Sequence, residues 1–285
     1  MELRTVGIVG SGQMGAGIAH VAAASGFEVI LTDIDAGVLE RGLESISQNL
    51  DRQIAKGLFV AGEKGAVLDR IKTSTHVTEH GRSDLVIETA VESFSIKSEI
   101  FRQLDSLCQP ETILASNTSS ISITRLAAVT QRPAQIIGMH FMNPVPVMRL
   151  VEIARGLETS DATATAVREV AETMGKTPVE CHDHPGFVSN RLLMPMINEA
   201  VFAVAENIAT PESIDQIMTL GMNHPMGPLR LADLIGLDNC LSVMRILHRE
   251  LGDPKYRPCP LLVKMVDAGR LGRKSGRGFF SYDEG

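Results

Sequence analysis

A glycine-rich segment lies directly after a short apolar run, Val6–Val9, and before an Ala-rich stretch of helical periodicity. In this context the first glycine permits a tight turn, the second lets the backbone approach a pyrophosphate, and the third lets helix and strand pack closely. We therefore predict a dinucleotide-binding loop at this place. The loop reads Gly10-Ser11-Gly12-Gln13-Met14-Gly15.

An acidic residue, Asp33, ends the next apolar run, 21 residues after Gly12. A carboxylate at this position can accept hydrogen bonds from the ribose hydroxyls of the adenosine half of a dinucleotide. A 2′-phosphate would meet like charge there, and Ile34-Asp35-Ala36 bring no cation to offset it. The sequence therefore predicts NAD rather than NADP as the cofactor.

One histidine and one glutamate have the spacing of a possible acid-base pair. His140 ends the run Ile136–His140, at the carboxyl edge of the expected sheet, where ligands of such folds bind. Glu152 follows 12 residues later on the next expected strand, where a carboxylate can orient an imidazole and stabilise its protonated form. Spacing alone leaves a second interpretation open, in which a loop histidine and a strand-end glutamate never meet.

Short β-branched runs alternate with helical stretches in the first part of the chain, a pattern typical of a helix-covered, mostly parallel sheet. We predict an α/β fold of Rossmann type over residues 1–185 as the NAD-binding domain. The expected strands are Val6–Val9, Glu28–Leu31, Leu85–Glu88, Thr112–Ala115, Ile136–His140, Val147–Ile153 and Thr177–Cys181. The expected helices are Gly12–Ser25, Ala36–Lys56, Phe94–Cys108 and Ala162–Met174.

The alternation stops at Asp183-His184-Pro185-Gly186, and little strand signal follows. We therefore predict an all-helical domain over residues 186–285, which serves the substrate and dimerisation. Its expected helices are Phe187–Asn207, Pro211–Leu220, Asp238–Leu251 and Pro260–Ala268. The first is apolar on more than one face, which favours a subunit interface and a homodimer.

Composition excludes several classes of function. The 27 basic and 34 acidic residues give a net charge of -7 without a Lys/Arg-rich tract, so nucleic acid is not an expected partner. No apolar run approaches the roughly 18 residues needed to span a bilayer, so we expect no membrane association. The four cysteines form no CxxC pair and no signal peptide is recognisable. We expect a cytoplasmic protein, with an organelle matrix as the alternative.

Two histidine pairs have spacings that occur in metal sites. His182 and His184 flank one aspartate, and His76 and His80 have i,i+4 spacing. Neither pair has a convincing third ligand, so we interpret them as surface or loop histidines and predict no metal.

The motifs together closely resemble the L-3-hydroxyacyl-CoA dehydrogenases, including the stand-alone 3-hydroxybutyryl-CoA dehydrogenases, from end to end. Besides the glycine loop, the segments that carry the resemblance are Ala115–Ser120, His140–Pro146, Asp183–Arg191 and Pro225–Pro228. Met142 departs from the Phe that many members carry, a difference in the lining of the expected substrate pocket.

The resemblance implies roles for individual residues. His140 is then the catalytic base with Glu152 as its carboxylate partner, and Ser119 and Asn190 contact the substrate oxygen. On sequence alone, Ser119 is equally an ordinary hydroxyl after a strand, and Asn190 equally a helix cap. Further contacts to the cofactor are implied in loops at Ala90, Glu92, Lys97 and Asn117.

A stretch of net positive charge is the expected contact for coenzyme A. Residues 41–72 hold six basic and four acidic residues, a net charge of +2 in a chain of -7. Arg52 and Lys56 have i,i+4 spacing on one expected helix, and the resemblance implies that they meet the CoA phosphates. Arg52 stands where some relatives have Lys, which keeps the charge. Without the resemblance, a solvated helix face is the preferred interpretation.

The expected activity is an NAD-dependent oxidation of (S)-3-hydroxyacyl-CoA, in particular 3-hydroxybutyryl-CoA, to 3-oxoacyl-CoA in fatty acid metabolism, so an acyl-CoA is the expected substrate. One alternative keeps the fold but takes a free hydroxy or sugar acid, as the related gulonate dehydrogenase and lambda-crystallin proteins do. Another is an NAD(H)-binding protein without catalysis. Activity on acetoacetyl-CoA but not on free acids separates the two enzymes, and absence of any turnover that consumes NADH would favour the protein without catalysis.

Overall fold

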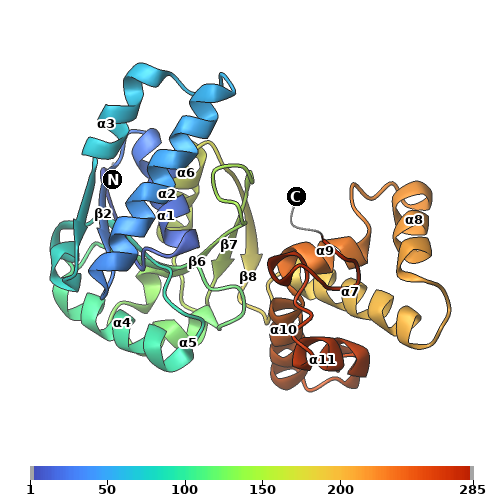
Figure 1. Ribbon diagram of the computed structural model, residues 1–285. Helices are drawn as coiled ribbons and strands as arrows, with labels where there is room; N and C mark the ends of the chain where they lie inside the picture. The colour runs from blue at the N-terminus through green and yellow to red at the C-terminus, as the bar shows by residue number, and fades with distance from the viewer. Residues whose placement is uncertain (1–2, 283–285) are drawn as a thin grey trace. The chain divides into compact units, whose positions relative to one another are not determined.

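The computed structural model describes residues 3–282 and divides the chain into two compact units, which meet in sequence between Asp183 and His184 (Figure 1). The first unit is built around a sheet and the second around helices. Each unit is described by itself below.

The first unit holds one sheet of eight strands, in the order β3-β2-β1-β4-β5-β6-β7-β8. All neighbouring strands are parallel except β6 and β7, so the predicted Rossmann-type, mostly parallel sheet is confirmed. The strands are β1 (Thr5–Val9), β2 (Glu28–Thr32), β3 (Ile71–Ser74), β4 (Leu85–Glu88), β5 (Ile113–Ser116), β6 (Ile136–Phe141), β7 (Leu150–Arg155) and β8 (Thr177–His182).

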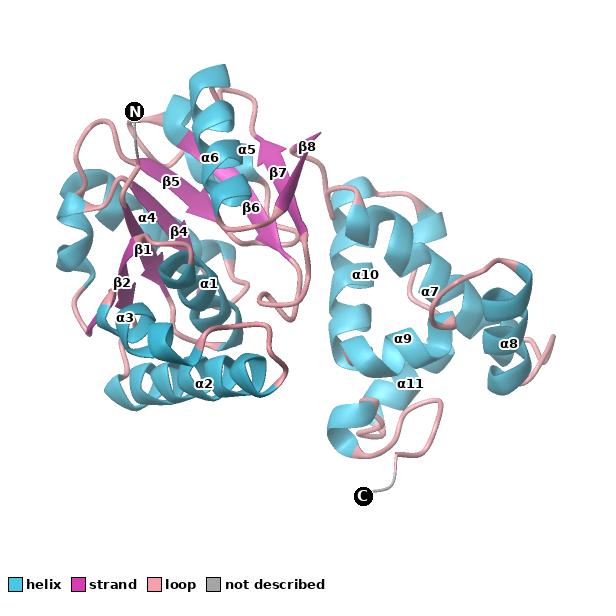
Figure 2. Cartoon of the chain, turned by 90° about the horizontal axis from the view of Figure 1, so that it is seen from above, coloured by secondary structure: helices cyan, strands magenta, loops and turns pink. Residues whose placement is uncertain are grey.

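Helices cover the sheet, which is why β4, β5 and β6 are buried along their whole length. Apolar residues of α1, α2 and α6 pack into one core cluster with the central strands, and Figure 2 shows α1 and α2 along the sheet. The helices of this unit are α1 (Gln13–Ala24), α2 (Ala36–Ala55), α3 (Lys64–Asp69), α4 (Phe94–Leu107), α5 (Ile123–Ala127) and α6 (Asp161–Thr173). Short 3-10 helices are η1 (Ala61–Glu63), η2 (Val77–Arg82) and η3 (Pro133–Gln135).

The second unit is helical, as predicted, and has its own apolar core. Its helices are α7 (Ser189–Ala205), α8 (Pro211–Gly221), α9 (Pro228–Ile235), α10 (Leu237–Leu251) and α11 (Pro260–Asp267), with the 3-10 helices η4 (Pro254–Tyr256) and η5 (Arg273–Ser275). Two buried aspartates join its parts. Asp215 on α8 accepts from the backbone N–H groups of Leu229 and Arg230 at the start of α9. Asp233 on α9 accepts from the N–H groups of Phe279 and Phe280.

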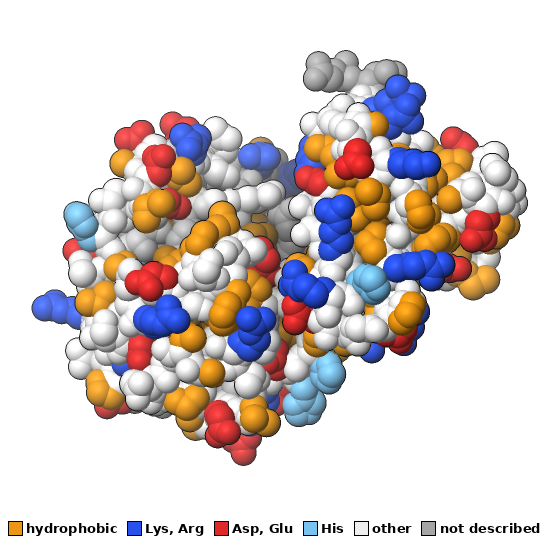
Figure 3. Space-filling view, turned by 90° about the horizontal axis from the view of Figure 1, so that it is seen from below, with side chains coloured by type: hydrophobic (Ala, Val, Ile, Leu, Met, Phe, Trp, Pro, Cys, Tyr) orange, Lys and Arg blue, Asp and Glu red, His pale blue; other side chains and the backbone are white. Residues whose placement is uncertain are grey.

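Large apolar side chains are exposed on the second unit, and Figure 3 shows hydrophobic side chains gathered on the face of this unit that is seen from below. They are Val188, Leu192, Ile208, Ile217, Leu220, Met222 and Leu234. Within residues 3–282, no helix is long and apolar enough to cross a membrane.

Most predicted elements are present with bounds shifted by a few residues at most, and three kinds of element were missed. Strand β3 lies at the edge of the sheet with Lys72 and Thr73 exposed, so it lacks a continuous apolar run. The short helices α3 and α5 give little periodic signal. Helix α9 has only eight residues, between Gly227 and Gly236.

Candidate active site

The glycine loop connects β1 to α1 and leaves open space for a ligand. Gly10 has φ +98°, a conformation that side chains rarely adopt. A Cβ on Gly15 would lie 1.8 Å from the carbonyl oxygen of Gly10, so only glycine allows this close packing. By contrast, a Cβ on Gly12 would meet no atom of the described residues within 4 Å. Since α1 begins here with no side-chain cap at Gly12, the loop fits the pyrophosphate of a dinucleotide.

Asp33 follows β2 directly and is joined to the glycine loop. Its Oδ2 accepts from the N–H of Ser11 at 2.8 Å and from the hydroxyl of Ser11 at 3.1 Å, and its Oδ1 accepts from the N–H of Asp35 at 3.2 Å. The next residue, Ile34, is 97% exposed. The carboxylate is thus held beside the pyrophosphate loop, the place that an NAD ribose requires.

His140 and Glu152 meet, so the interpretation in which they stay apart is wrong. They lie directly opposite each other in the antiparallel ladder of β6 and β7, which places their side chains on the same face. Nδ1 of His140 lies 2.8 Å from Oε2 of Glu152, and both side chains are buried. Because an ionised carboxylate can only accept, this contact places a proton on Nδ1 and leaves Nε2 as the basic nitrogen of the neutral ring.

Lys97 is not a loop residue, which corrects the expectation for it. It lies on α4, is 1% exposed, and its Nζ donates to both carboxylate oxygens of Glu88 at 2.8 and 2.9 Å and to the carbonyl of Ala90 at 3.0 Å. Glu88 ends β4 and accepts as well from the N–H of Ala90 and the hydroxyl of Ser116. Burial raises the pKa of Glu88, and the charge of Lys97 offsets part of that effect.

Glu92 lies in the loop between β4 and α4 and binds the loop that follows β5. Its Oε1 accepts from the hydroxyls of Thr118 at 2.6 Å and Ser120 at 2.8 Å, and from the N–H of Ser119 at 3.1 Å. Oε2 lies 3.5 Å from Nζ of Lys97. Burial alone would raise the pKa of Glu92, but the charge of Lys97 and these hydrogen bonds outweigh it and lower the pKa.

Asn117 and Asn190 lie in different units. Oδ1 of Asn117, directly after β5, accepts from the N–H of Phe141 at 2.9 Å, so it joins the carboxyl ends of β5 and β6 beside His140. Asn190 lies in the first turn of α7 in the second unit, and its N–H donates to Gly186. The N-cap position of α7 is Val188, so the interpretation of Asn190 as a helix cap is wrong.

Arg52 and Lys56 are exposed near the end of α2, and the two are one helical turn apart. Arg52 lies in the last turn and its Nε donates to the carbonyl of Gln48 at 3.3 Å. Lys56 is the C-cap residue, and its N–H bonds back to the carbonyl of Arg52. Both cations are therefore available to an anion in solution.

The structure corrects the interpretation of His80 as a surface or loop histidine. His80 lies in η2, is 0% exposed, and its Nε2 lies 2.8 Å from the hydroxyl of Thr32. Burial lowers the pKa of His80 to about 4. Its partner in sequence, His76, is exposed. Among residues 3–282, no three His, Cys, Asp or Glu side chains are grouped as a metal site would require.

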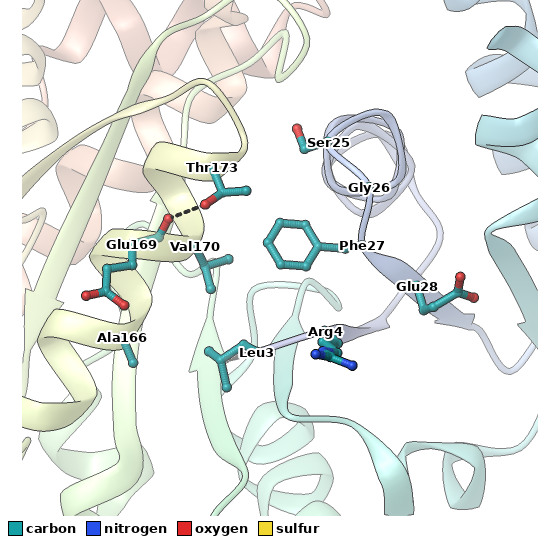
Figure 4. Close-up of a pocket in the computed structure, with 10 residues that line it drawn as sticks. All are labelled: Leu3, Arg4, Ser25, Gly26, Phe27, Glu28, Ala166, Glu169, Val170 and Thr173. Carbon is teal, nitrogen blue, oxygen red and sulfur yellow. Dashed lines mark hydrogen bonds between the residues drawn. The ribbon is translucent and has the colours of Figure 1, made fainter. Parts of the chain in front are cut away.

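A pocket of about 490 Å³ lies at the opposite, amino edge of the sheet. Figure 4 shows the ring of Phe27 in it, between the turn that ends α1 and helix α6. Ser25 and Gly26 line it from that turn, and Glu28 from the first residue of β2. Ligands of parallel sheets bind at the carboxyl edge, so this pocket is not part of the cofactor site.

The residues that sequence reasoning missed share one feature: they are polar and buried at strand ends. Glu88 ends an otherwise apolar strand, and Ser116, Thr118 and Ser120 belong to the Ala115–Ser120 segment that sequence analysis singled out for Ser119 and Asn117. A charge at the end of a buried apolar run was the available signal for Glu88.

Fold and site together define an NAD-dependent oxidoreductase of Rossmann type. The open glycine loop, the acidic residue after β2 and the His140–Glu152 pair all belong to the first unit. The two carboxyl-edge loops after β4 and β5 add a hydrogen-bonded cluster around Glu92.

Comparison with known families identifies the class further. A model described as the NAD binding domain of 3-hydroxyacyl-CoA dehydrogenase matches residues 5–184, and a model described as the C-terminal domain of the same enzyme matches residues 186–282. The chain belongs to the 3-hydroxyacyl-CoA dehydrogenase family, and NAD is its cofactor. The resemblance drawn from the sequence is confirmed.

Individual relatives are similar over their whole length. The chain is 56% identical over 284 residues to a probable 3-hydroxybutyryl-CoA dehydrogenase of Bacillus subtilis, covering 100% of this chain and 99% of that one. It is 53% identical to a 3-hydroxybutyryl-CoA dehydrogenase of Bradyrhizobium diazoefficiens, covering 98% and 96%. Among solved structures, the (S)-3-hydroxybutyryl-CoA dehydrogenase of Ralstonia eutropha is 50% identical with a TM-score of 0.96, covering 99% and 100%.

Proposed function

We propose that the chain interconverts (S)-3-hydroxybutyryl-CoA and acetoacetyl-CoA with NAD(H), as a step of fatty acid metabolism. The names of the relatives support the substrate. The observation that carries the chemistry is the 2.8 Å contact between Nδ1 of His140 and Oε2 of Glu152, at the end of the sheet where the cofactor loop lies. Oxidation of a secondary alcohol requires a base at that place.

His140 is the base of this reaction. In the oxidation direction its Nε2 takes up the hydroxyl proton, and Nδ1–H continues to donate to Glu152. When bound, NAD⁺ accepts the hydride that leaves the hydroxyl-bearing carbon. The carboxylate of Glu152 stabilises the imidazolium that forms on His140, because opposite charges at hydrogen-bond distance favour the protonated ring. In the reverse direction the same imidazolium returns the proton to the substrate oxygen.

Two further side chains hold the oxygen of the substrate. The hydroxyl of Ser119 and the side-chain amide of Asn190 donate to it and fix the reacting carbon. Main-chain and side-chain groups of the cofactor loops hold NAD: the glycine loop its pyrophosphate, Asp33 its adenosine ribose, and the loops after β4 and β5 its nicotinamide half. These loops contain the contacts expected at Ala90, Glu92 and Asn117, with Lys97 behind them.

Arg52 and Lys56 bind the phosphates of coenzyme A, and this assignment can be tested by charge reversal. The double substitution Arg52→Glu and Lys56→Glu should raise KM for acetoacetyl-CoA about 10- to 100-fold, because two charge-assisted contacts become repulsive. An acetoacetyl-pantetheine thioester lacks the nucleotide phosphates, so its kcat/KM should hardly change. If the double variant has the same KM and kcat/KM as the wild type with both substrates, Arg52 and Lys56 belong to a solvated helix face.

The second unit forms a homodimer. Its exposed apolar residues, among them Leu192 on α7 and Leu220 on α8, at 68% and 78% exposed, are more than a lone helical unit leaves in water. Light scattering at micromolar concentration should give twice the chain mass of 30.8 kDa. A monomer under those conditions would reject the dimer.

The test of the function is the oxidation of NADH with a series of 3-oxoacyl-CoA thioesters of increasing chain length and with free 3-oxo acids, together with the reduction of NAD⁺ by free hydroxy acids, both followed at 340 nm. We expect turnover of acetoacetyl-CoA with the highest kcat/KM at four carbons and none with free acids. Turnover of free acids alone would favour the dehydrogenase of a free hydroxy or sugar acid. Absence of any turnover would favour the NAD(H)-binding protein without catalysis.

A further inference from the structure

Three consecutive residues with hydroxyl groups follow β5, and their hydrogen bonds to Glu92 differ. They are Thr118, Ser119 and Ser120. The hydroxyls of Thr118 and Ser120 donate to one carboxylate oxygen of Glu92, at 2.6 and 2.8 Å, and both side chains are buried. The hydroxyl of Ser119 lies 3.5 Å from the same oxygen and is half-buried. Glu92 thus uses the two flanking hydroxyls and leaves the middle one only weakly bound.

The backbone of this loop is fixed by the same cluster. The N–H of Ser119 donates to Oε1 of Glu92 at 3.1 Å, and the hydroxyl of Thr118 also accepts from the N–H groups of Ser120 and Ile121. All three short hydrogen bonds to Oε1 therefore come from the segment 118–120, which carries Ser119. A side chain with its backbone anchored on both sides loses little further freedom when it binds a substrate.

Glu92 is itself held from behind. Its Oε2 lies 3.5 Å from Nζ of Lys97, and Lys97 is fixed by both oxygens of Glu88 and the carbonyl of Ala90. Glu88 binds the hydroxyl of Ser116, one residue before the loop begins. The two loops after β4 and β5 form one hydrogen-bonded unit with Lys97 as its buried cation.

A direct role for Glu92 in cofactor binding is the competing interpretation. Oε1 already accepts from three donors within 3.1 Å, which exceeds the two lone pairs of a carboxylate oxygen, and Oε2 faces Lys97. Oε1 therefore has no acceptor capacity left for a ligand, and the oxygen that remains for a contact with the cofactor is Oε2. Oε1 is suited to hold the loop, and the second test separates this role from a contact of Oε2 with the cofactor.

We propose that Glu92 is a positioning residue, which fixes the loop 117–121 so that the hydroxyl of Ser119 is presented to the substrate oxygen. The proposal rests on the proposed function, because the contact of Ser119 with the substrate is part of that function. Lys97 and Glu88 act in turn through Glu92, as the charges that keep its carboxylate in place.

The first test needs no activity. Amide hydrogen exchange of the segment 117–121 should rise about 10-fold in Glu92→Met, where the three donors lose their acceptor. In Glu92→Gln the amide oxygen still accepts, so exchange should stay within about threefold of the wild type. Glu99→Met is the matched control, because Glu99 is an exposed residue of α4 that binds only Arg102 and Gln103 of its own helix among the described residues. The Glu92 side chain is 34% exposed, so its substitution should leave the fold intact. Equal protection of the segment in Glu92→Met and the wild type would overturn the proposal.

The second test separates positioning from cofactor binding. At saturating NADH and acetoacetyl-CoA, Glu92→Met should lower kcat about 10- to 100-fold whatever its effect on the NADH dissociation constant, because saturation removes any deficit in cofactor binding. Adding Ser119→Ala to Glu92→Met should lower kcat no more than about twofold further, because both act through one hydroxyl. Effects on kcat that multiply in the double variant, or a kcat of Glu92→Met that saturating NADH restores to the wild-type value, would contradict the proposal. A wild type without turnover on acetoacetyl-CoA would reject the proposed function instead, and hydrogen exchange would still decide the role of Glu92.

Discussion

Buried polar side chains have different partners in the two units of the chain. In the described part of the second unit they are Asn198, Asp215 and Asp233, and each binds backbone groups of a neighbouring segment. At the carboxyl edge of the sheet in the first unit, buried side chains bind one another, as His140 binds Glu152 and Lys97 binds Glu88. Backbone partners fix the course of the chain, whereas side-chain pairs hold titratable groups for chemistry.

Substitution at the sheet edge should separate catalysis from stability, and this is the largest effect that we expect. In His140→Asn the amide nitrogen can lie where Nδ1 lies, so Glu152 keeps a donor while the base is lost. We expect kcat to fall about 100- to 10,000-fold, with the free energy of unfolding within about 1 kcal/mol of the wild type. Steady-state kinetics and urea denaturation measure the two. Near-normal turnover would remove His140 from the mechanism.

Substitution of a buried polar residue in the second unit should lower stability and leave catalysis unchanged. Asp233 is 1% exposed and accepts from two backbone N–H groups and the hydroxyl of Tyr282. In Asp233→Ala these donors lose their partner, so the free energy of unfolding should fall by about 3 kcal/mol. The kcat of the folded enzyme should stay within about twofold. Asp267→Ala, an exposed change at the end of α11, is the control. A stable variant with low kcat would mean that the contrast between the units is wrong.

His80 is a buried titratable side chain of the first unit that lies outside the site, so its effect should be on stability and not on catalysis. Its pKa in the folded protein is about 4 against 6.5 as the ordinary value, so the unfolded state takes up a proton first as the pH falls. The stabilisation is complete above pH 6.5 and is lost progressively toward pH 4. Between pH 7 and pH 5 the free energy of unfolding should drop by about 2 kcal/mol through this group.

The measurement is urea denaturation of the wild type, His80→Gln and His76→Gln at both pH values. The drop should shrink in His80→Gln and persist in His76→Gln, because His76 is exposed. A drop that is the same in all three proteins would assign the pH dependence to other groups.

The sequence predicted the sheet because its central strands are continuous apolar runs between glycine turns and amphipathic helices. It also indicated both members of the His140–Glu152 pair. Their contact could not be decided from spacing, because it depends on β6 and β7 being antiparallel with His140 opposite Glu152. A shift of one residue in that register would place the two side chains on opposite faces of the sheet.

The cluster behind Ser119 was beyond sequence reasoning for a similar cause. Lys97 was expected in a loop that contacts the cofactor, and its burial follows only when α4 packs with its first turn over the end of β4. His80 was interpreted as a surface or loop histidine because the pair with His76 lacks a third metal ligand. It lies instead in a 3-10 helix and contacts Thr32 at the end of β2, a residue 48 positions away that no local pattern connects to it.

The central claim is that His140 takes up and returns the proton of the reaction while the charge of Glu152 stabilises its protonated form, and the pH dependence of Glu152→Gln tests it most directly. The glutamine oxygen can still accept from Nδ1–H, so the ring keeps its orientation while the negative charge is lost. With 3-hydroxybutyryl-CoA and NAD⁺ at saturation, kcat rises with pH as the base loses its proton. We predict that the midpoint of this rise moves to lower pH by about 1 unit or more, because the imidazolium loses its neighbouring negative charge, and that kcat on the plateau falls. A midpoint and a plateau equal to those of the wild type would contradict the account.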